Sequence, residues 1–178
     1  MDMATKSGNE VEALKETFRY NSFVRKKYLD ALGKLPKEEL VRDRGASYPS
    51  MLDIFGHVLG AYAHWLMHIY PGHRTKEFEQ FTDGQTLEDA RQDEKLVDTY
   101  VMNFVEGLDQ EKLDSTFVVN KAEGKWRISL RQLLWHLVEE ELQHRGELNA
   151  LFWQLDIDPP VTGWLDWKFA TGEIKTIS

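Results

Sequence analysis

The chain has 178 residues, of which 42% are hydrophobic and 29% charged, and its formal net charge is −8 at neutral pH. This length fits one domain with a sizeable core, and the acidic balance argues against nucleic acid as a partner, because nucleic-acid-binding proteins carry basic patches. The sequence has no cysteine, which excludes disulfides, thiolate metal ligands and a cysteine nucleophile. It also lacks a membrane-length apolar run and an N-terminal signal segment, so we expect a cytoplasmic protein without a membrane partner.

Hydrophobic periodicity and end signals predict four long helices. The first runs from about residue 9 to residue 35 and is closed by Pro36. The second begins in a capping box of Ser50 and Asp53 and stops at residues 71–72, which are Pro-Gly.

The two remaining helices also begin at capping signals. The third starts at Thr86, with Asp89 three residues later, and keeps apolar residues on one face. The fourth starts at Ser129, with Gln132 in the same spacing, and ends before Pro159.

The connections complete the predicted fold. Two β-prone runs, 117–121 and 125–128, flank a Gly-containing turn between the third and fourth helices and predict a small β-hairpin. The polar segment 73–85 is long enough to return along a helix, so an up-down-down-up course and a simple meander are both allowed. We therefore predict an all-α four-helix bundle with a hairpin appendage.

We expect one domain over residues 8–170, with flexible termini at 1–7 and 171–178. The tail carries Trp164, Trp167 and Phe169, which we expect to dock on the bundle or on a second subunit. The two tryptophans are alternatively a roof over a pocket. The aromatic content of 12% and the apolar third helix together predict a homodimer.

Glu140 and His144 are the most informative pair in the chain. They lie one turn apart on the stripe of the fourth helix that carries its leucines, and Glu139 and Glu141 point about 100° to either side. A carboxylate aimed into an apolar layer costs several kcal/mol unless it is compensated. A divalent metal shared with another helix is the compensation we favour. The leucines of the stripe are Leu133, Leu137, Leu148, Leu151 and Leu155.

The second helix supplies histidines for such a site. His57, His64 and His68 share a narrow face, but His57 and His64 lie about 10.5 Å apart along the axis and cannot bind one ion together. Gly56 and Gly60 each cost about 1 kcal/mol relative to alanine, which suggests close backbone approach or space kept for a ligand.

Ordinary alternatives exist for these residues. A run of glutamates is usually a solvated face, and a histidine beside an apolar arc is usually a hydrogen-bonded boundary residue. His136, one turn before Glu140, is a candidate second-layer partner or competing ligand. The residues alone therefore leave the metal site open.

Two segments resemble the DinB/YfiT-like metalloenzymes. The run from His136 to Leu148, with the pair Glu140 and His144, Arg-Gly after it and Pro159-Pro160 at the end, is similar to the last-helix signature of that family. The run 50–65 is similar to its second-helix signature, and the resemblance covers roughly residues 10–160.

The resemblance implies that the metal ligands are His57, Glu140 and His144, and that His64 and His68 are not ligands. Glu140 departs from the family, which more often has histidine there; Glu147 likewise replaces glutamine. Three ligands with an open position are typical of catalytic metals. The carboxylate cancels one unit of metal charge and leaves Zn, Ni, Fe or Mn as candidates.

The resemblance also implies an activity on a small-molecule substrate. Family members include transferases and isomerases that use a low-molecular-weight thiol, bacillithiol or mycothiol, and some hydrolases. A chain without cysteine fits a thiol that arrives from outside, whereas in a hydrolase Glu147, His136 or His64 are candidate proton carriers. The alternatives are a non-catalytic metal- or ligand-binding stress-response protein and an inert bundle in which Glu140 accepts from a helix-end donor or pairs with an arginine such as Arg145.

Overall fold

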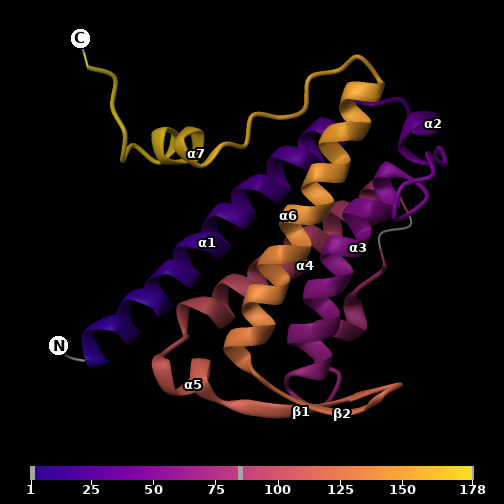
Figure 1. Cartoon of the computed structure of the whole chain (residues 1–178). Helices are drawn as coiled ribbons and strands as arrows, with labels where there is room; N and C mark the ends of the chain where they lie inside the picture. The colour runs from indigo at the N-terminus through magenta and orange to yellow at the C-terminus, as the bar shows by residue number, and fades with distance from the viewer. Residues whose placement is uncertain (1–2, 84–85, 178) are drawn as a thin grey trace.

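The structure is a computed structural model that describes residues 3–83 and 86–177. Four long helices pack around one hydrophobic core, and a two-stranded sheet lies at one end of the bundle (Figure 1). This confirms the predicted all-α four-helix bundle with a hairpin. The long helices are α1 (Met3–Leu32), α3 (Met51–His64), α4 (Leu87–Glu106) and α6 (Leu130–Gln154).

Short elements connect the long helices. A π-helical turn, η1, continues α3 and carries the second predicted helix almost to its expected end at residues 71–72. No helix in the part of the chain that the structure describes has both the length and the hydrophobicity of a membrane span. The short elements are α2 (Lys37–Leu40), η1 (Trp65–Ile69), η2 (Phe78–Gln80), α5 (Gln110–Asp114) and α7 (Trp164–Ala170).

The helices follow the up-down-down-up course. The Tyr100 hydroxyl of α4 donates to the Leu66 carbonyl at 3.2 Å, and further along both helices the Tyr70 and Phe104 rings meet at 5.5 Å. Later residues after α3 contact later residues of α4, which shows that the two helices run parallel. The chain therefore returns to the starting end of α3 before α4 begins, which rules out the simple meander (Figure 1).

All three predicted capping boxes are present. In each, the N-cap hydroxyl accepts the backbone N–H of the third helical residue, whose side chain accepts the N-cap N–H in return. This local exchange satisfies donors that a helix start otherwise leaves unpaired. The pairs are Ser50 with Asp53, Thr86 with Asp89, and Ser129 with Gln132.

The hairpin also forms where it was predicted. Strands β1 (Thr116–Lys121) and β2 (Gly124–Ser129) pair antiparallel, with Val119 opposite Trp126 and Lys121 opposite Gly124. Gly124 has φ of +133°, a conformation that favours glycine and explains the residue at this turn. The hairpin crosses the end of the bundle at which α6 begins (Figure 1).

The C-terminal tail docks on α1 mainly through Trp167. Trp167 is buried against Tyr20, with ring centroids 5.6 Å apart, and the Tyr20 hydroxyl donates to the Thr162 carbonyl. Trp164 joins this contact while half-exposed, but Phe169 remains 57% exposed and does not dock on the bundle, so its docking on a second subunit stays a prediction. The predicted domain and its flexible termini stay predictions, and residues 1–2 and 178 lie outside the described residues.

A buried charge cluster joins all four long helices. Arg25 of α1 donates to Glu141 of α6 at 2.9 Å and approaches Asp98 of α4 at 3.4 Å. The Tyr62 hydroxyl of α3 donates to the same Glu141 oxygen at 2.6 Å. Arg25 and Glu141 are almost entirely buried, so Glu141, although it points to the side of the Glu140 stripe as predicted, is not part of a solvated glutamate face. The reason is that α6 packs on α1 as well as on α3, which makes its buried face broader than one stripe.

Both charges in this cluster depend on each other. Burial alone would lower the pKa of Arg25, but Glu141 and the other acidic groups nearby raise it above its ordinary value. Burial raises the pKa of Glu141, and Arg25 and Tyr62 offset this only in part. Removing one partner therefore leaves the other charge buried without compensation.

We expect Glu141→Ala to lower the free energy of unfolding by about 3–5 kcal/mol, because it leaves Arg25 unpaired in the core. Urea denaturation measures the effect. The exposed neighbour substitution Glu139→Ala is the control and should change stability by less than about 0.5 kcal/mol. The double variant Arg25→Met/Glu141→Leu should lose less than Glu141→Ala alone. Equal effects of the two single glutamate variants would contradict this account.

Candidate metal centre

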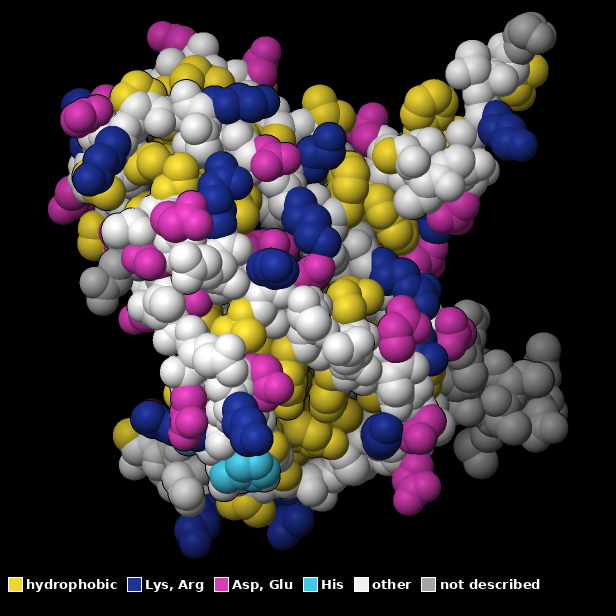
Figure 2. Space-filling model, turned by 180° about the vertical axis from the view of Figure 1, so that it is seen from behind, with side chains coloured by type: hydrophobic (Ala, Val, Ile, Leu, Met, Phe, Trp, Pro, Cys, Tyr) yellow, Lys and Arg dark blue, Asp and Glu magenta, His cyan; other side chains and the backbone are white. Residues whose placement is uncertain are grey.

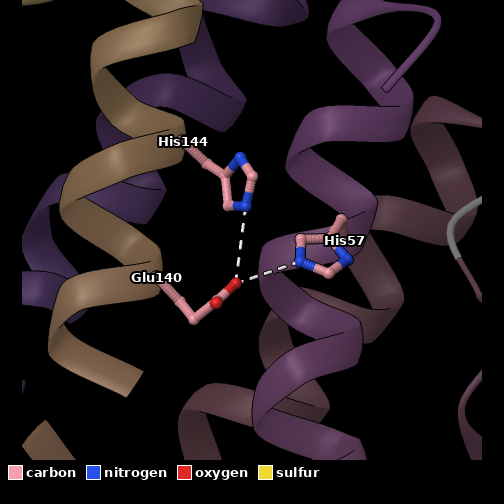
Figure 3. Close-up of side chains that lie close together, drawn as sticks. All are labelled: His57, Glu140 and His144. Carbon is pink, nitrogen blue, oxygen red and sulfur yellow. Dashed lines mark hydrogen bonds and ion pairs between the residues drawn. The ribbon is translucent and has the colours of Figure 1, made fainter. Parts of the chain in front are cut away.

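His57 of α3 meets Glu140 and His144 of α6 across the gap between these helices (Figure 3). One Glu140 oxygen, Oε2, lies 3.1 Å from His57 Nε2 and 3.4 Å from His144 Nε2. The three side chains place their nearest ligand atoms within 4.8 Å of one another. The three residues named as metal ligands from the sequence are therefore brought together by the fold.

Antiparallel packing of two capped helices produces this arrangement. Glu140 and His144 are one helical turn apart and face α3 together, as their spacing requires. The His144 side chain is buried, with 4% exposed, whereas Glu140 and His57 keep 21% and 29% exposed. The carboxylate thus lies at the edge of the core and not inside it, which corrects the predicted depth of Glu140.

Further side chains orient the two imidazoles. Glu147 Oε2 lies 3.3 Å from His144 Nδ1, on the ring nitrogen that faces away from Glu140, and it also accepts the Ser47 hydroxyl. Tyr48 stacks on the His57 ring at a centroid distance of 4.1 Å, and its hydroxyl lies 3.0 Å from His57 Nε2. A histidine ligand commonly has its second nitrogen held by a carboxylate in this way.

The donor set fits a divalent metal ion. Two ligand atoms bound about 2.1 Å from a tetrahedral ion lie about 3.4 Å apart, and the two Glu140–imidazole distances, 3.1 and 3.4 Å, are close to this spacing. Two imidazole nitrogens and one carboxylate oxygen suit Zn, Ni, Fe and Mn. The Glu147 contact leaves Nε2 of His144 free to face the ion.

The three candidate ligands border an open pocket of about 600 Å³. Its walls come from α3, α6, the loop before α3 and the end of β1. Most of its lining is polar side chains and imidazoles, and the volume suits a small organic molecule. The lining residues are Ser47, Tyr48, His57, Gly60, Ala61, His64, Trp65, Lys121, His136, Glu140, Gln143 and His144.

His136 is the nearest further imidazole. Its Nε2 lies 3.8 Å from Glu140 Oε1 and its Nδ1 lies 3.6 Å from Glu139, and these three residues form a second group of potential ligands at the rim. His64 and His68 have ring centroids 5.7 Å apart, but within the described residues they gather no third ligand.

The geometry decides two other expectations. Trp164 and Trp167 pack on Tyr20 of α1 and do not line this pocket, so the alternative prediction that they cover a pocket is wrong. Arg145 contacts the Tyr20 hydroxyl at 2.8 Å, and Glu140 contacts imidazoles, so the Glu140–Arg145 alternative is also wrong.

Close packing does not require glycine at positions 56 and 60 of α3. A Cβ at Gly56 would meet nothing within 4 Å, and one at Gly60 would make only ordinary contacts at 4.0 Å. Close backbone approach therefore does not explain them. Gly60 lines the pocket, in keeping with space kept for a ligand.

Sequence reasoning missed Tyr48 and Lys121. Tyr48 lies two residues before the Ser50 cap, where no periodicity places a side chain, and Lys121 ends strand β1, far along the chain. Partial burial, and then the charges of Glu140 and Glu147, raise the pKa of Tyr48. The phenol therefore stays protonated at neutral pH and is able to donate a hydrogen bond.

Comparison with known proteins agrees with this fold. The sequence model of the DinB family matches residues 3–175, almost the whole chain, and the chain therefore belongs to the DinB family. Its structure is similar to that of a DinB-like protein from Bacillus cereus, with a TM-score of 0.63 and 15% identity over 84% of this chain and 95% of the other. No curated protein matches the sequence. The resemblance inferred from the two helix signatures is confirmed.

We expect His64 to titrate below the ordinary histidine pKa. Partial desolvation lowers its pKa, and the positive charges of His68 and Lys121 lower it further, so the imidazole is neutral at pH 7. Lys121→Met should raise the His64 pKa because it removes one of these charges. NMR titration of the ring measures it, with Lys125→Met as the control. An unchanged His64 pKa in Lys121→Met would contradict the assignment.

Proposed function

We propose that this DinB-family chain binds a divalent metal through His57, Glu140 and His144 and acts as a metal-dependent enzyme on a small molecule. The observation that carries the proposal is the convergence of three ligand atoms within 4.8 Å beside an open pocket. Three protein ligands with one side open are typical of catalytic sites, whereas structural sites are closed.

Each neighbouring side chain has a defined part in this proposal. Glu147 holds His144 by Nδ1 and so directs Nε2 toward the ion. Tyr48 covers the His57 ring and offers its hydroxyl hydrogen beside the ligands. When bound, the metal would stabilise a thiolate or acidify water, although less strongly than with three neutral ligands because Glu140 is charged.

A thiol-dependent transferase is the reaction that we favour. The chain has no cysteine, so a nucleophilic sulfur has to come from a bound small molecule. The pocket of about 600 Å³ is far larger than a water-activating site requires and has room for a thiol together with its acceptor. For a hydrolase, His136 at the rim is the better placed proton carrier, because Glu147 is engaged by His144 and Ser47.

A non-catalytic metal-binding protein is the second candidate. It is favoured by one observation, the Tyr48 hydroxyl 3.0 Å from His57 Nε2. At this distance the phenol oxygen is close enough to occupy the remaining position of an ion held by the three ligands. A stress-response or storage role would follow from a metal whose coordination is complete.

We expect the purified protein to bind about one equivalent of Co²⁺ or Zn²⁺, and His57→Ala to reduce the affinity by 10-fold or more, because one of three ligands is lost. Metal analysis after dialysis and Co²⁺ absorption spectra measure this. His73→Ala is the matched control, since His73 is exposed and bonds only to the Pro71 carbonyl in the described structure.

The Co²⁺ spectrum also separates the two candidates. A thiol that enters an open position changes the spectrum, which supports the enzyme. Bound Co²⁺ that does not respond to any thiol supports the second candidate, with Tyr48 in the remaining position. Equal metal content of the wild type and His57→Ala would refute both.

The predicted homodimer stays a proposal. The apolar face of α4 packs on α1 and α3, but half-buried Leu96, Tyr100 and Phe104 line a groove of about 690 Å³ on its outer side. Figure 2 shows hydrophobic side chains gathered on the face seen from behind, where α4 lies.

We expect a dimer in sedimentation at micromolar concentration and a monomer for Leu96→Glu. A wild-type monomer would refute the dimer.

A further inference from the structure

Lys121 is the one ammonium group among the residues that line the candidate metal pocket. It ends β1, beside the two-residue turn of the hairpin. Its Nζ lies 5.0 Å from the ring centroid of Trp65 and 5.9 Å from that of Trp126. Two indole faces thus hold the ammonium at the pocket wall by cation–π attraction.

The charge of Lys121 is not balanced by the pocket itself. Glu140 is the one acidic residue among the described lining residues, and both of its oxygens face imidazoles: Oε2 faces His57 and His144, and Oε1 faces His136. No ion pair of Lys121 is found among the described side chains. Lys121 also lowers the pKa of His64, in agreement with a positive potential on this wall.

A short row of contacts leads from Lys121 to the candidate ligands. Trp65 touches Lys121 on one side and the His136 ring on the other, at a centroid distance of 5.7 Å. His136 in turn lies 3.8 Å from Glu140. The hairpin lies at the end of the bundle where α6 begins (Figure 1), and Lys121, at the end of its first strand, lines the pocket. A small molecule with one end at the ligands and the other at Lys121 therefore spans one wall of the pocket.

We propose that the pocket takes a small organic anion, with one atom at the metal held by His57, Glu140 and His144 and its anionic group paired with Lys121. This inference rests on the proposed metal site. Lys121 is exposed, and the two indole rings beside it keep its ammonium at the pocket wall, where it can form a charge-assisted hydrogen bond to a carboxylate or phosphate. Lys121 is then a specificity-determining residue, and neutral molecules of the same shape bind less tightly.

The test uses two thiols of equal size that differ in charge, 3-mercaptopropionate and 3-mercaptopropionamide. Each is titrated into the Co²⁺-loaded full chain, and the sulfur–cobalt charge-transfer absorption reports binding. The measured quantity is the ratio of the two dissociation constants. A carboxylate also interacts with the metal, so the change in this ratio between protein variants is decisive, and not the ratio itself.

Lys121→Met and Lys121→Gln should each reduce the preference for the anionic thiol by about 5-fold, the size expected for one partly exposed charge pair. Lys121→Arg should retain it. The matched control is Lys125→Met, because Lys125 lies on β2 of the same hairpin but does not line the pocket. The preference should also weaken at high salt in the wild type and not in Lys121→Met.

The outcomes separate the two proposals. Unchanged ratios in Lys121→Met and Lys121→Gln, with Co²⁺ bound normally, overturn the role of Lys121 and leave the metal site standing. An equal drop in Lys125→Met also overturns it, since any positive charge on the hairpin would then suffice. Failure of the wild type to bind Co²⁺ overturns the metal site and this inference with it.

Discussion

The ion pair between Arg25 and Glu141 is the constraint on which the rest of the bundle depends. Its partners come from α1 and α6, and Asp98 and Tyr62 extend it to α4 and α3, so one cluster fixes the four long helices relative to each other. A buried pair adds little stability by itself, because desolvation offsets much of the attraction. Its effect is on geometry: with Glu141 held toward α1, the next residue back, Glu140, is turned about 100° away, toward α3.

The candidate metal centre follows from that rotation. α6 presents Glu140 and His144 to α3, and the antiparallel course of the two helices brings His57 opposite them. Ligands on rigid helices hold their positions better than ligands on loops, and Glu147 adds a contact that fixes the His144 ring. The loop before α3 and the hairpin contribute the remaining walls, with Tyr48 and Lys121. Rigid helices thus supply the ligands, and the connecting segments supply the surroundings that select what binds.

The sequence predicted the features that depend on neighbouring residues. Capping boxes such as Ser50 with Asp53 and the hairpin turn before Gly124 are formed by side chains within a few positions of each other. The ligand set came from family resemblance, since periodicity alone left a solvated Glu139–Glu141 face possible. Helical phase gave the direction of Glu141 but not its burial, because the width of a buried face is set by the number of helices that pack on it. Tyr48 reaches the site through tertiary contacts, and no pattern in the sequence predicts its position there.

The π-helical turn η1 changes which side chains of the α3 segment face its neighbouring elements. A π turn contains one residue more than an α turn, so it acts as a single-residue insertion and shifts the phase of everything after it. Upstream of it, His57 keeps the face that looks at α6. Downstream, Tyr70 meets Phe104 of α4 and Phe117 of β1. The π turn thereby divides one continuous helix into two segments with different rotational phase. The segment that carries His57 can face α6 while the segment after the turn faces α4 and the sheet.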